Sequence, residues 1–210
     1  MQRIILKLKG WDFNMDKVVP IVDLKKLYVA EVKEDGLTTV FGEPKYYEGV
    51  KELGLKPKVN SDDFYAEGIL WLSDTTLANI DVEIDITDLK KEEEAFLLGH
   101  KLATEGGIIR SANDKAPEVA LLYKAIKGNG KARYGIMYKG AFSIADESYK
   151  GKEGKSNYQT KKLKGTFAPL RSNEMWNYKV DEEDGMTDEK FFKEVIIPTE
   201  KVETIENEEA

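Results

Sequence analysis

The chain has 210 residues, a formal net charge of −7 and no cysteine. This length suits one domain with its own core, and the absence of cysteine excludes disulfides, thiolate metal sites and a cysteine nucleophile. No run of about 18 apolar residues exists, so the sequence predicts no segment that spans a membrane.

Strands dominate the elements predicted along the chain. Residues 24–32 are rich in β-forming side chains, and a polar loop follows from Lys33 to about Pro44. Further strands are predicted at residues 46–59, 69–72, 79–87, 107–110, 119–126, 132–145, 156–168 and 175–180. Gly128-Asn129-Gly130 predicts a hairpin turn. The pattern is that of a mainly β fold, a sandwich or barrel with one helix on its flank.

Residues 79–87 alternate between apolar and polar side chains. Because successive side chains of a strand point to opposite faces, this alternation predicts a half-buried strand. The apolar positions are Ile80, Val82, Ile84 and Ile86, and the acids between them are Asp81, Glu83 and Asp85. The acidic row has three interpretations: a solvated face, catalytic carboxylates spaced about 6.6 Å along the strand, or a negative wall that repels phosphate.

A short helix is predicted at about residues 89–98, directly after this strand. Asp88 is the expected N-cap, and Gly99 ends the helix. His100 is the only histidine, and no second ligand accompanies it at a metal-binding spacing. We therefore expect His100 to cap the helix C-terminus or to pack locally, and we expect no metal and no cofactor.

Charge is distributed in blocks. Residues 60–98 hold 11 acids and 2 lysines, whereas residues 121–165 hold 11 basic groups and 3 acids. The basic block also contains five tyrosines: Tyr123, Tyr134, Tyr138, Tyr149 and Tyr158. Its composition fits a nucleic-acid surface, ordinary strands with one wet face, or a surface that pairs with the acidic block of a neighbouring copy.

The two ends of the chain differ from its middle. Residues 181–210 hold 12 acids and 3 lysines, with one helical turn expected near Phe191-Phe192. The sequence therefore divides into an N-terminal arm at 1–19, a β domain at 20–185 and an acidic tail at 186–210. We expect the arm and the tail to be mobile, because they lack apolar periodicity.

Seven short strings occur in the chain in the order found in one known family. They are LKKLYVA (24–30), LGLKPKVN (53–60), YAEG (65–68), LLGHK (97–101), APEVA (116–120), YGIMYKG (134–140) and YQTKKLKGTF (158–167). As an ordered set over about residues 20–185, they resemble the phage major tail proteins of long, non-contractile tails. Family members start near Met15, so residues 1–14 look like an added arm or the product of an upstream start codon, and we expect the chain to lack the C-terminal immunoglobulin-like domain that some larger relatives carry.

The resemblance implies a structural virion protein with no catalytic residues. Its copies would be β-sandwiches with a flanking helix, forming hexameric rings that stack into the tail tube. The implied partners are other copies, the tape measure protein and the tail terminator or tip proteins, with double-stranded DNA passing through unbound. The protein would be made in the host cytoplasm and reside in the virion. Asp81, Glu83 and Asp85 are then candidate acids of the lumen wall.

Two other functions stay open at this point. One is a ligand- or carbohydrate-binding β-sandwich module on a virion or cell surface. The other is a glycosidase-like enzyme that uses the acids of residues 79–87. For an assembling subunit, residues 33–49 and 60–68 are the expected loops, and at least one is expected to reach a neighbouring ring.

Overall fold

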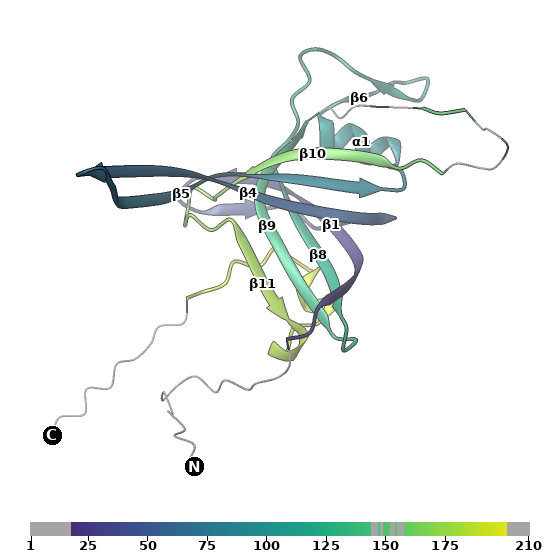
Figure 1. The fold of residues 1–210 in the computed structure, drawn as a ribbon. Coiled ribbons are helices and arrows are strands. Elements are labelled where there is room, and N and C mark those ends of the chain that lie inside the picture. Colours follow the sequence, from purple (N-terminus) through teal and green to yellow (C-terminus); the bar gives the residue numbers. More distant parts are fainter. Residues whose placement is uncertain (1–17, 144–146, 148, 152–153, 155–157, 201–210) are drawn as a thin grey trace.

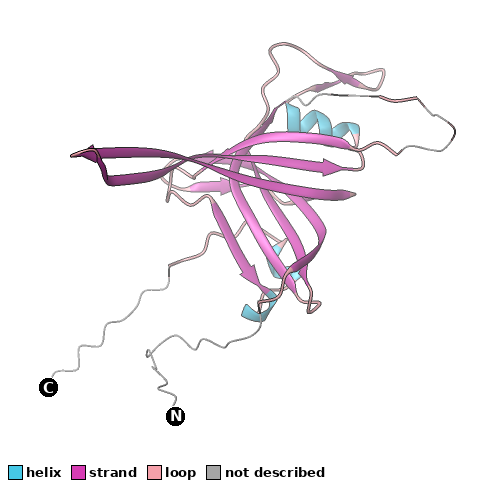
Figure 2. Cartoon of the chain, viewed as in Figure 1, coloured by secondary structure: helices cyan, strands magenta, loops and turns pink. Residues whose placement is uncertain are grey.

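The computed structural model describes residues 18–143, 147, 149–151, 154 and 158–200. Within this part the protein is mainly β, as the sequence predicts, with one large antiparallel sheet and few helices (Figures 1 and 2). Nearly all of the predicted N-terminal arm, and residues 201–210 of the predicted tail, lie outside the described residues.

The structural elements follow the predicted order with several changes of bounds. The strands are β1 Ile21–Asp35, β2 Thr39–Phe41, β3 Lys45–Tyr47, β4 Val50–Ala66, β5 Ile69–Ile86, β6 Lys101–Leu102, β7 Ile108–Ile109, β8 Val119–Lys127, β9 Ala132–Ser143, β10 Lys161–Ala168 and β11 Asn177–Asp181. The helical segments are α1 Lys91–Leu98, the 3-10 turn η1 Glu182–Asp184 and α2 Asp188–Phe191.

The large sheet has the strand order β2-β1-β8-β9-β10-β5-β4, with β3 added to β1 and β11 added to β9. β6 and β7 form a separate two-stranded ribbon. The predicted hairpin turn at 128–130 joins β8 to β9, and Gly130 N donates a hydrogen bond to Lys127 O. Figure 1 shows β4, β5 and β10 crossing over β8 and β9, so the sheet turns back over itself.

The first core lies where the two halves of this sheet face each other. Its apolar side chains come from β1, β8 and β9 on one side and from β5 and β10 on the other, with Leu97 and Leu98 of α1 packed against them. All four apolar residues of the alternating segment, from Ile80 to Ile86, are buried in it. The predicted inward face of this strand is therefore confirmed.

The second core covers the opposite face of β1, β8 and β9. It combines their small and aromatic side chains with residues of the C-terminal segment, so that β8 and β9 are buried on both faces. Residues 186–197, which the sequence assigns to an acidic tail, belong to this core: Met186, Phe191, Phe192, Val195 and Ile196 contribute to it. The predicted start of the tail at residue 186 is wrong for this segment.

Three contacts fix the C-terminal segment to the sheet. Phe191 is fully buried, and the Phe192 ring stacks on Tyr28 with the ring centroids 4.2 Å apart. Tyr138 donates its hydroxyl hydrogen to Ile196 O at 2.8 Å. A few apolar side chains therefore anchor a segment whose average composition is acidic. Burial of their aromatic surface stabilises the contact, while the charged residues between them stay in water.

β4 and β5 form a long hairpin that projects from the body on the left of Figure 1. The sequence predicts two short strands with a loop at 60–68, but strand pairing continues up to Ala66 and Ile69. Polar side chains support the pairing in the middle of the hairpin, where the Ser61 and Ser73 hydroxyls both donate to Asp63 Oδ1. Because these exposed residues are polar, the sequence of this part of the hairpin resembles a loop.

Helix α1 starts two residues later than predicted. Its N-cap is Lys90, whose backbone N donates to Glu93 Oε2 at 3.0 Å, and not Asp88. The Asp88 side chain accepts a hydrogen bond from Leu89 N instead. The predicted end is confirmed, because Gly99 has a left-handed conformation with φ of 70° and any Cβ there would collide with Lys115 O.

Candidate functional site

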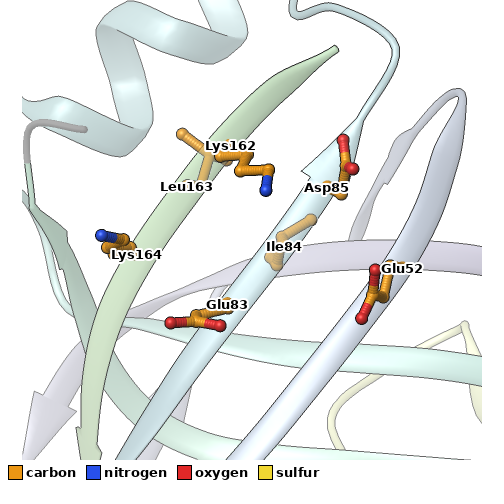
Figure 3. A pocket seen from close by; sticks show the side chains of 7 residues that line it. All are labelled: Glu52, Glu83, Ile84, Asp85, Lys162, Leu163 and Lys164. Atoms are coloured by element: carbon orange, nitrogen blue, oxygen red, sulfur yellow. The ribbon is translucent and has the colours of Figure 1, made fainter. Parts of the chain in front are cut away.

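The predicted acidic row occupies the outer face of β5. Asp81, Glu83 and Asp85 point away from the first core, opposite to the buried isoleucines and valine of the same strand. Figure 3 shows Glu83 and Asp85 between a strand on either side. The three acids are thus brought together on one face, as the alternation predicts.

Lysines flank the acids on the strand that precedes them in the hairpin. On β4, Lys56 Nζ lies 2.6 Å from Glu83 Oε2, and Lys58 Nζ lies 2.7 Å from Asp81 Oδ2. The hydrogen bond from Lys56 lowers the pKa of Glu83. A lowered pKa is the opposite of what a general acid at neutral pH requires.

The strand on the other side adds two more lysines. On β10, Lys162 lies opposite Asp85 and Lys164 lies opposite Glu83. Figure 3 shows these two lysines along the strand next to β5, around a shallow groove whose lining also includes Ile84 and Leu163. The face is therefore a column of acids between two columns of lysines, rather than the wholly negative surface that the strand alone suggests.

The tip of the β4–β5 hairpin is the most unusual surface of the protein. Six large apolar side chains there are each between 50 and 71% exposed: Phe64, Tyr65, Ile69, Leu70, Trp71 and Leu72. The sequence predicts a short strand at residues 69–72 but not the exposure of its side chains. The available signal was a run of four apolar residues without alternation, which indicates that both faces of a strand are apolar.

Part of the basic block is neutralised within the same chain. Lys127 on β8 pairs with Asp181 at 3.0 Å and with Glu183 at 2.7 Å, and Arg133 on β9 pairs with Asp181 at 2.7 Å. The hydrogen bond from Arg133 is the main cause that lowers the pKa of Asp181 to about 2. These basic residues thus hold the C-terminal segment and are not free for a neighbouring copy.

Asp188 at the start of α2 makes a second such contact. Its carboxylate accepts hydrogen bonds from Lys26 at 2.8 Å, Lys124 at 2.7 Å and the Tyr134 hydroxyl at 2.6 Å. Burial acts to raise the pKa of Asp188, but the hydrogen bonds from the two lysines outweigh it and lower the pKa. The acidic composition of this segment therefore complements the basic sheet against which it packs.

The tyrosines of the basic block do not form one surface. Tyr123, Tyr134 and Tyr138 are buried in the two cores, whereas Tyr149 and Tyr158 are exposed. Stacking on nucleic-acid bases needs accessible rings. The interleaved lysine and tyrosine pattern therefore does not assemble a base-stacking platform from these five residues.

His100 packs locally, as predicted. Its ring is buried, and its Nδ1 lies 2.7 Å from Asp114 Oδ2, which also accepts a hydrogen bond from Ser111 N. His100 N donates to Ala95 O at the end of α1. The pair ties the loop before β8 to the helix.

The described residues contain no group of three or more histidine and acidic side chains placed to hold a metal ion. They also contain no helix with the length and apolarity that crossing a membrane requires. No model of a known protein family matches the chain, and no curated protein matches it.

Proposed function

We propose that the chain is a structural virion protein whose copies form hexameric rings stacked as a phage tail tube, a conduit for DNA. The ordered resemblance to major tail proteins motivates the proposal, and the mainly β fold with a helix packed on its sheet supports it. Its partners would be other copies, the tape measure protein and the terminator or tip proteins. No residue has a catalytic role in this proposal.

The exposed tip of the β4–β5 hairpin is the observation that carries the proposal. Contiguous exposed apolar patches of this kind mark sites of association, because leaving them in water is unfavourable. The tip lies at the end of a long arm that projects away from the body in Figure 1. Such an arm can reach a neighbouring subunit.

The edge of β4 is a second feature that suits assembly. β4 ends the path of the large sheet, so in the described part of the chain no strand pairs with its outer edge. Lys56, Pro57 and Lys58 occupy this edge near the base of the hairpin and discourage unspecific pairing with other strands. A subunit that assembles in one defined way needs both an accessible edge and this protection.

For the lumen, we propose that the outer face of β4, β5 and β10 lines the channel. The candidate acids Asp81, Glu83 and Asp85 would then meet passing DNA together with their flanking lysines. Such a face carries little net charge, and ion pairs to Glu83 and Asp81 hold the two lysines of β4, so that these two cations are less available to phosphates. This differs from simple repulsion by a negative wall.

A carbohydrate-binding module is the second candidate. The exposed rings of Trp71 and Tyr65 resemble the aromatic platforms on which sugar rings stack. Asp62, Asp63 and Asp74 lie nearby on the hairpin and offer hydrogen-bond acceptors for hydroxyl groups. This reading predicts a protein that works as a monomer.

Negative-stain electron microscopy of the full chain tests the proposal. We expect rings or tubes as protein concentration rises, with a dependence on salt, since charged groups border the proposed contacts. Particles that stay monomeric at high concentration across salt conditions would overturn it. A saccharide that quenches tryptophan fluorescence of such monomers would favour the second candidate.

A further inference from the structure

The turn between β8 and β9 contains the one asparagine of the chain that a glycine follows. Asn129 and Gly130 are both exposed there, and Gly130 has a positive φ of 83°. An asparagine loses its side-chain amide most readily before glycine, because no side chain hinders the approach of the following backbone nitrogen. Every other asparagine of the chain precedes a residue with a side chain. This turn is therefore the place at which such chemistry should occur first.

Both ends of the Asn129 side-chain amide have a partner. Lys131 N donates to Oδ1 at 3.1 Å, and Nδ2 donates to Glu183 Oε1 at 3.4 Å. The first contact favours attack on Cγ, since a backbone N–H at Oδ1 stabilises the negative charge that this oxygen gains when a nucleophile adds. The second contact places the amide beside η1, the turn that leads into α2.

One hydrogen bond restrains the nucleophile. Gly130 N is the atom that would attack, and it donates to Lys127 O at 2.8 Å. Attack requires this N–H to leave Lys127 O and lose its proton, so it occurs only in the fraction of molecules in which the turn is open. Openings of this kind are least costly at exposed turns, such as the one that ends the β8–β9 hairpin. The fold therefore slows the reaction without preventing it.

We propose that Asn129 is a site of spontaneous deamidation, and that the carboxylate formed there loosens the attachment of η1 to the sheet. Gly130 N gives up its proton and bonds to Asn129 Cγ, while the bond from Cγ to Nδ2 breaks and ammonia leaves with that proton. Water then opens the imide ring. Cleavage between the ring nitrogen and Cγ gives aspartate, whereas cleavage between the ring nitrogen and the main-chain carbonyl carbon gives isoaspartate.

The new carboxylate would lie among acids that already share one buried cation. Lys127 Nζ lies 2.7 Å from Glu183 and 3.0 Å from Asp181, and the Lys127 side chain is buried. A carboxylate at residue 129 repels Glu183 across the former hydrogen bond and competes with it for Lys127. Isoaspartate also lengthens the backbone of the turn, which disturbs the pairing of β8 with β9. Both products therefore weaken the contact between this turn and η1.

Peptide mapping by mass spectrometry tests the site directly, on the purified full-length chain kept at mildly alkaline pH. We expect Asn129 to change from amide to acid faster than every other asparagine of the chain, to give both aspartate and isoaspartate, and to react faster still in urea, where the turn is open. Asn129→Gln is the matched control: its longer side chain forms the ring far more slowly, so position 129 should keep its amide. Conversion of Asn129 no faster than that of the other asparagines would overturn the proposal.

The consequence for η1 is measured with Asn129→Asp, which carries the charge of the aspartate product from the start. Hydrogen exchange of the η1 backbone amides should be faster in this variant than in wild type, and Asn129→Gln should resemble wild type. The difference should shrink in a Glu183→Gln background and at high salt, because it arises from repulsion between two carboxylates. Equal exchange in Asn129→Asp and wild type would overturn the proposed loosening. Monomers suffice for both measurements, so their outcome does not depend on the proposed tube.

Discussion

Lys56 and Glu83 face each other across the base of the long hairpin, with Nζ and Oε2 2.6 Å apart. Both side chains are about half exposed, so the pair adds little stability: exposed pairs contribute about 0.2–1 kcal/mol. Its effect is on the surface that the protein presents. Because Lys56 neutralises Glu83, this acid adds no net charge to the proposed lumen wall.

The first prediction concerns this face. Replacing Asp81, Glu83 and Asp85 together by lysine should leave the subunit folded, with the free energy of unfolding lowered by about 1–2 kcal/mol, because the altered side chains are on the outer face. The flanking lysines would then have no acid between them. We expect tubes of this variant to retain DNA, most strongly at low salt.

DNA retention can be measured by co-sedimentation of DNA fragments with tubes and by the rate of DNA ejection. A control variant with lysine at the exposed positions Glu34, Glu105 and Glu189 adds the same charge elsewhere. Equal retention by both variants, or none by either, would show that residues 81–85 do not line the channel.

The second prediction separates folding from assembly at the tip. Leu70→Ser combined with Trp71→Ser should change the free energy of unfolding by no more than about 0.5 kcal/mol, since exposed side chains contribute little to the isolated fold. Assembly should be lost or shifted to at least tenfold higher concentration. Light scattering against concentration measures this, and Val18→Ser, another highly exposed position, serves as the control.

The third prediction concerns Asp35, at the end of β1. Asp35 pairs with the buried Lys139 and accepts hydrogen bonds from Arg171 N, so that a deletion of residues 35–42 would also remove this contact. An uncompensated buried lysine costs about 3–5 kcal/mol. We therefore expect Asp35→Ala to lower stability by that amount in urea denaturation.

Leu37, at the tip of the same turn, is fully exposed. Leu37→Ser should leave the free energy of unfolding within about 0.5 kcal/mol of wild type and should weaken tube elongation if the turn reaches a neighbouring ring. Normal tubes from this variant would remove the turn from the contact.

The fourth prediction concerns the C-terminal segment. Phe191→Ala should lower the free energy of unfolding by about 3–5 kcal/mol, because the ring is fully buried in the second core. Removal of residues 201–210 together with residues 1–14 should leave stability unchanged. Truncation after Gly185 should prevent folding. Thermal denaturation followed by circular dichroism distinguishes the substitution and the two truncations. A chain that ends at Glu200 and is less stable than wild type would contradict the prediction.

The fifth prediction is a dependence on pH. Asp181 and Asp188 have lowered pKa values in the folded protein, that of Asp181 about 2 against an ordinary 3.8. An acid with a lowered pKa stabilises the fold fully above its unfolded pKa and ceases to do so as the pH falls through its folded pKa. Stability should therefore drop between about pH 4 and pH 2.

The urea midpoint of wild type and of Asp181→Asn, measured across this pH range, tests the effect. The variant should be less stable than wild type at pH 7 and should lose less stability on acidification. Parallel pH profiles for the two proteins would show that Asp181 does not couple the C-terminal segment to pH.

Local alternation was a good guide to the fold and a poor guide to its surface. The inward side of residues 80–86 follows from a period of two and is confirmed. The lysines beside the acids could not be predicted, since Lys56 lies 27 positions from Glu83 and only strand register brings them together. The burial of Phe191 was not predicted, because a single buried ring has no periodicity and residues 181–210 around it hold 12 acids.

The C-terminal segment completes the second core, so the fold cannot be finished until the end of the chain has been synthesised. β1 pairs with β8, about 100 positions later in the chain, and Phe191 fills the second core later still. Contacts between such distant positions form slowly, because a long loop must close first. The apolar hairpin tip at residues 64–72 therefore leaves the ribosome well before the body that carries it can fold, so every nascent chain passes through a period in which this tip is exposed and the two cores are not yet formed.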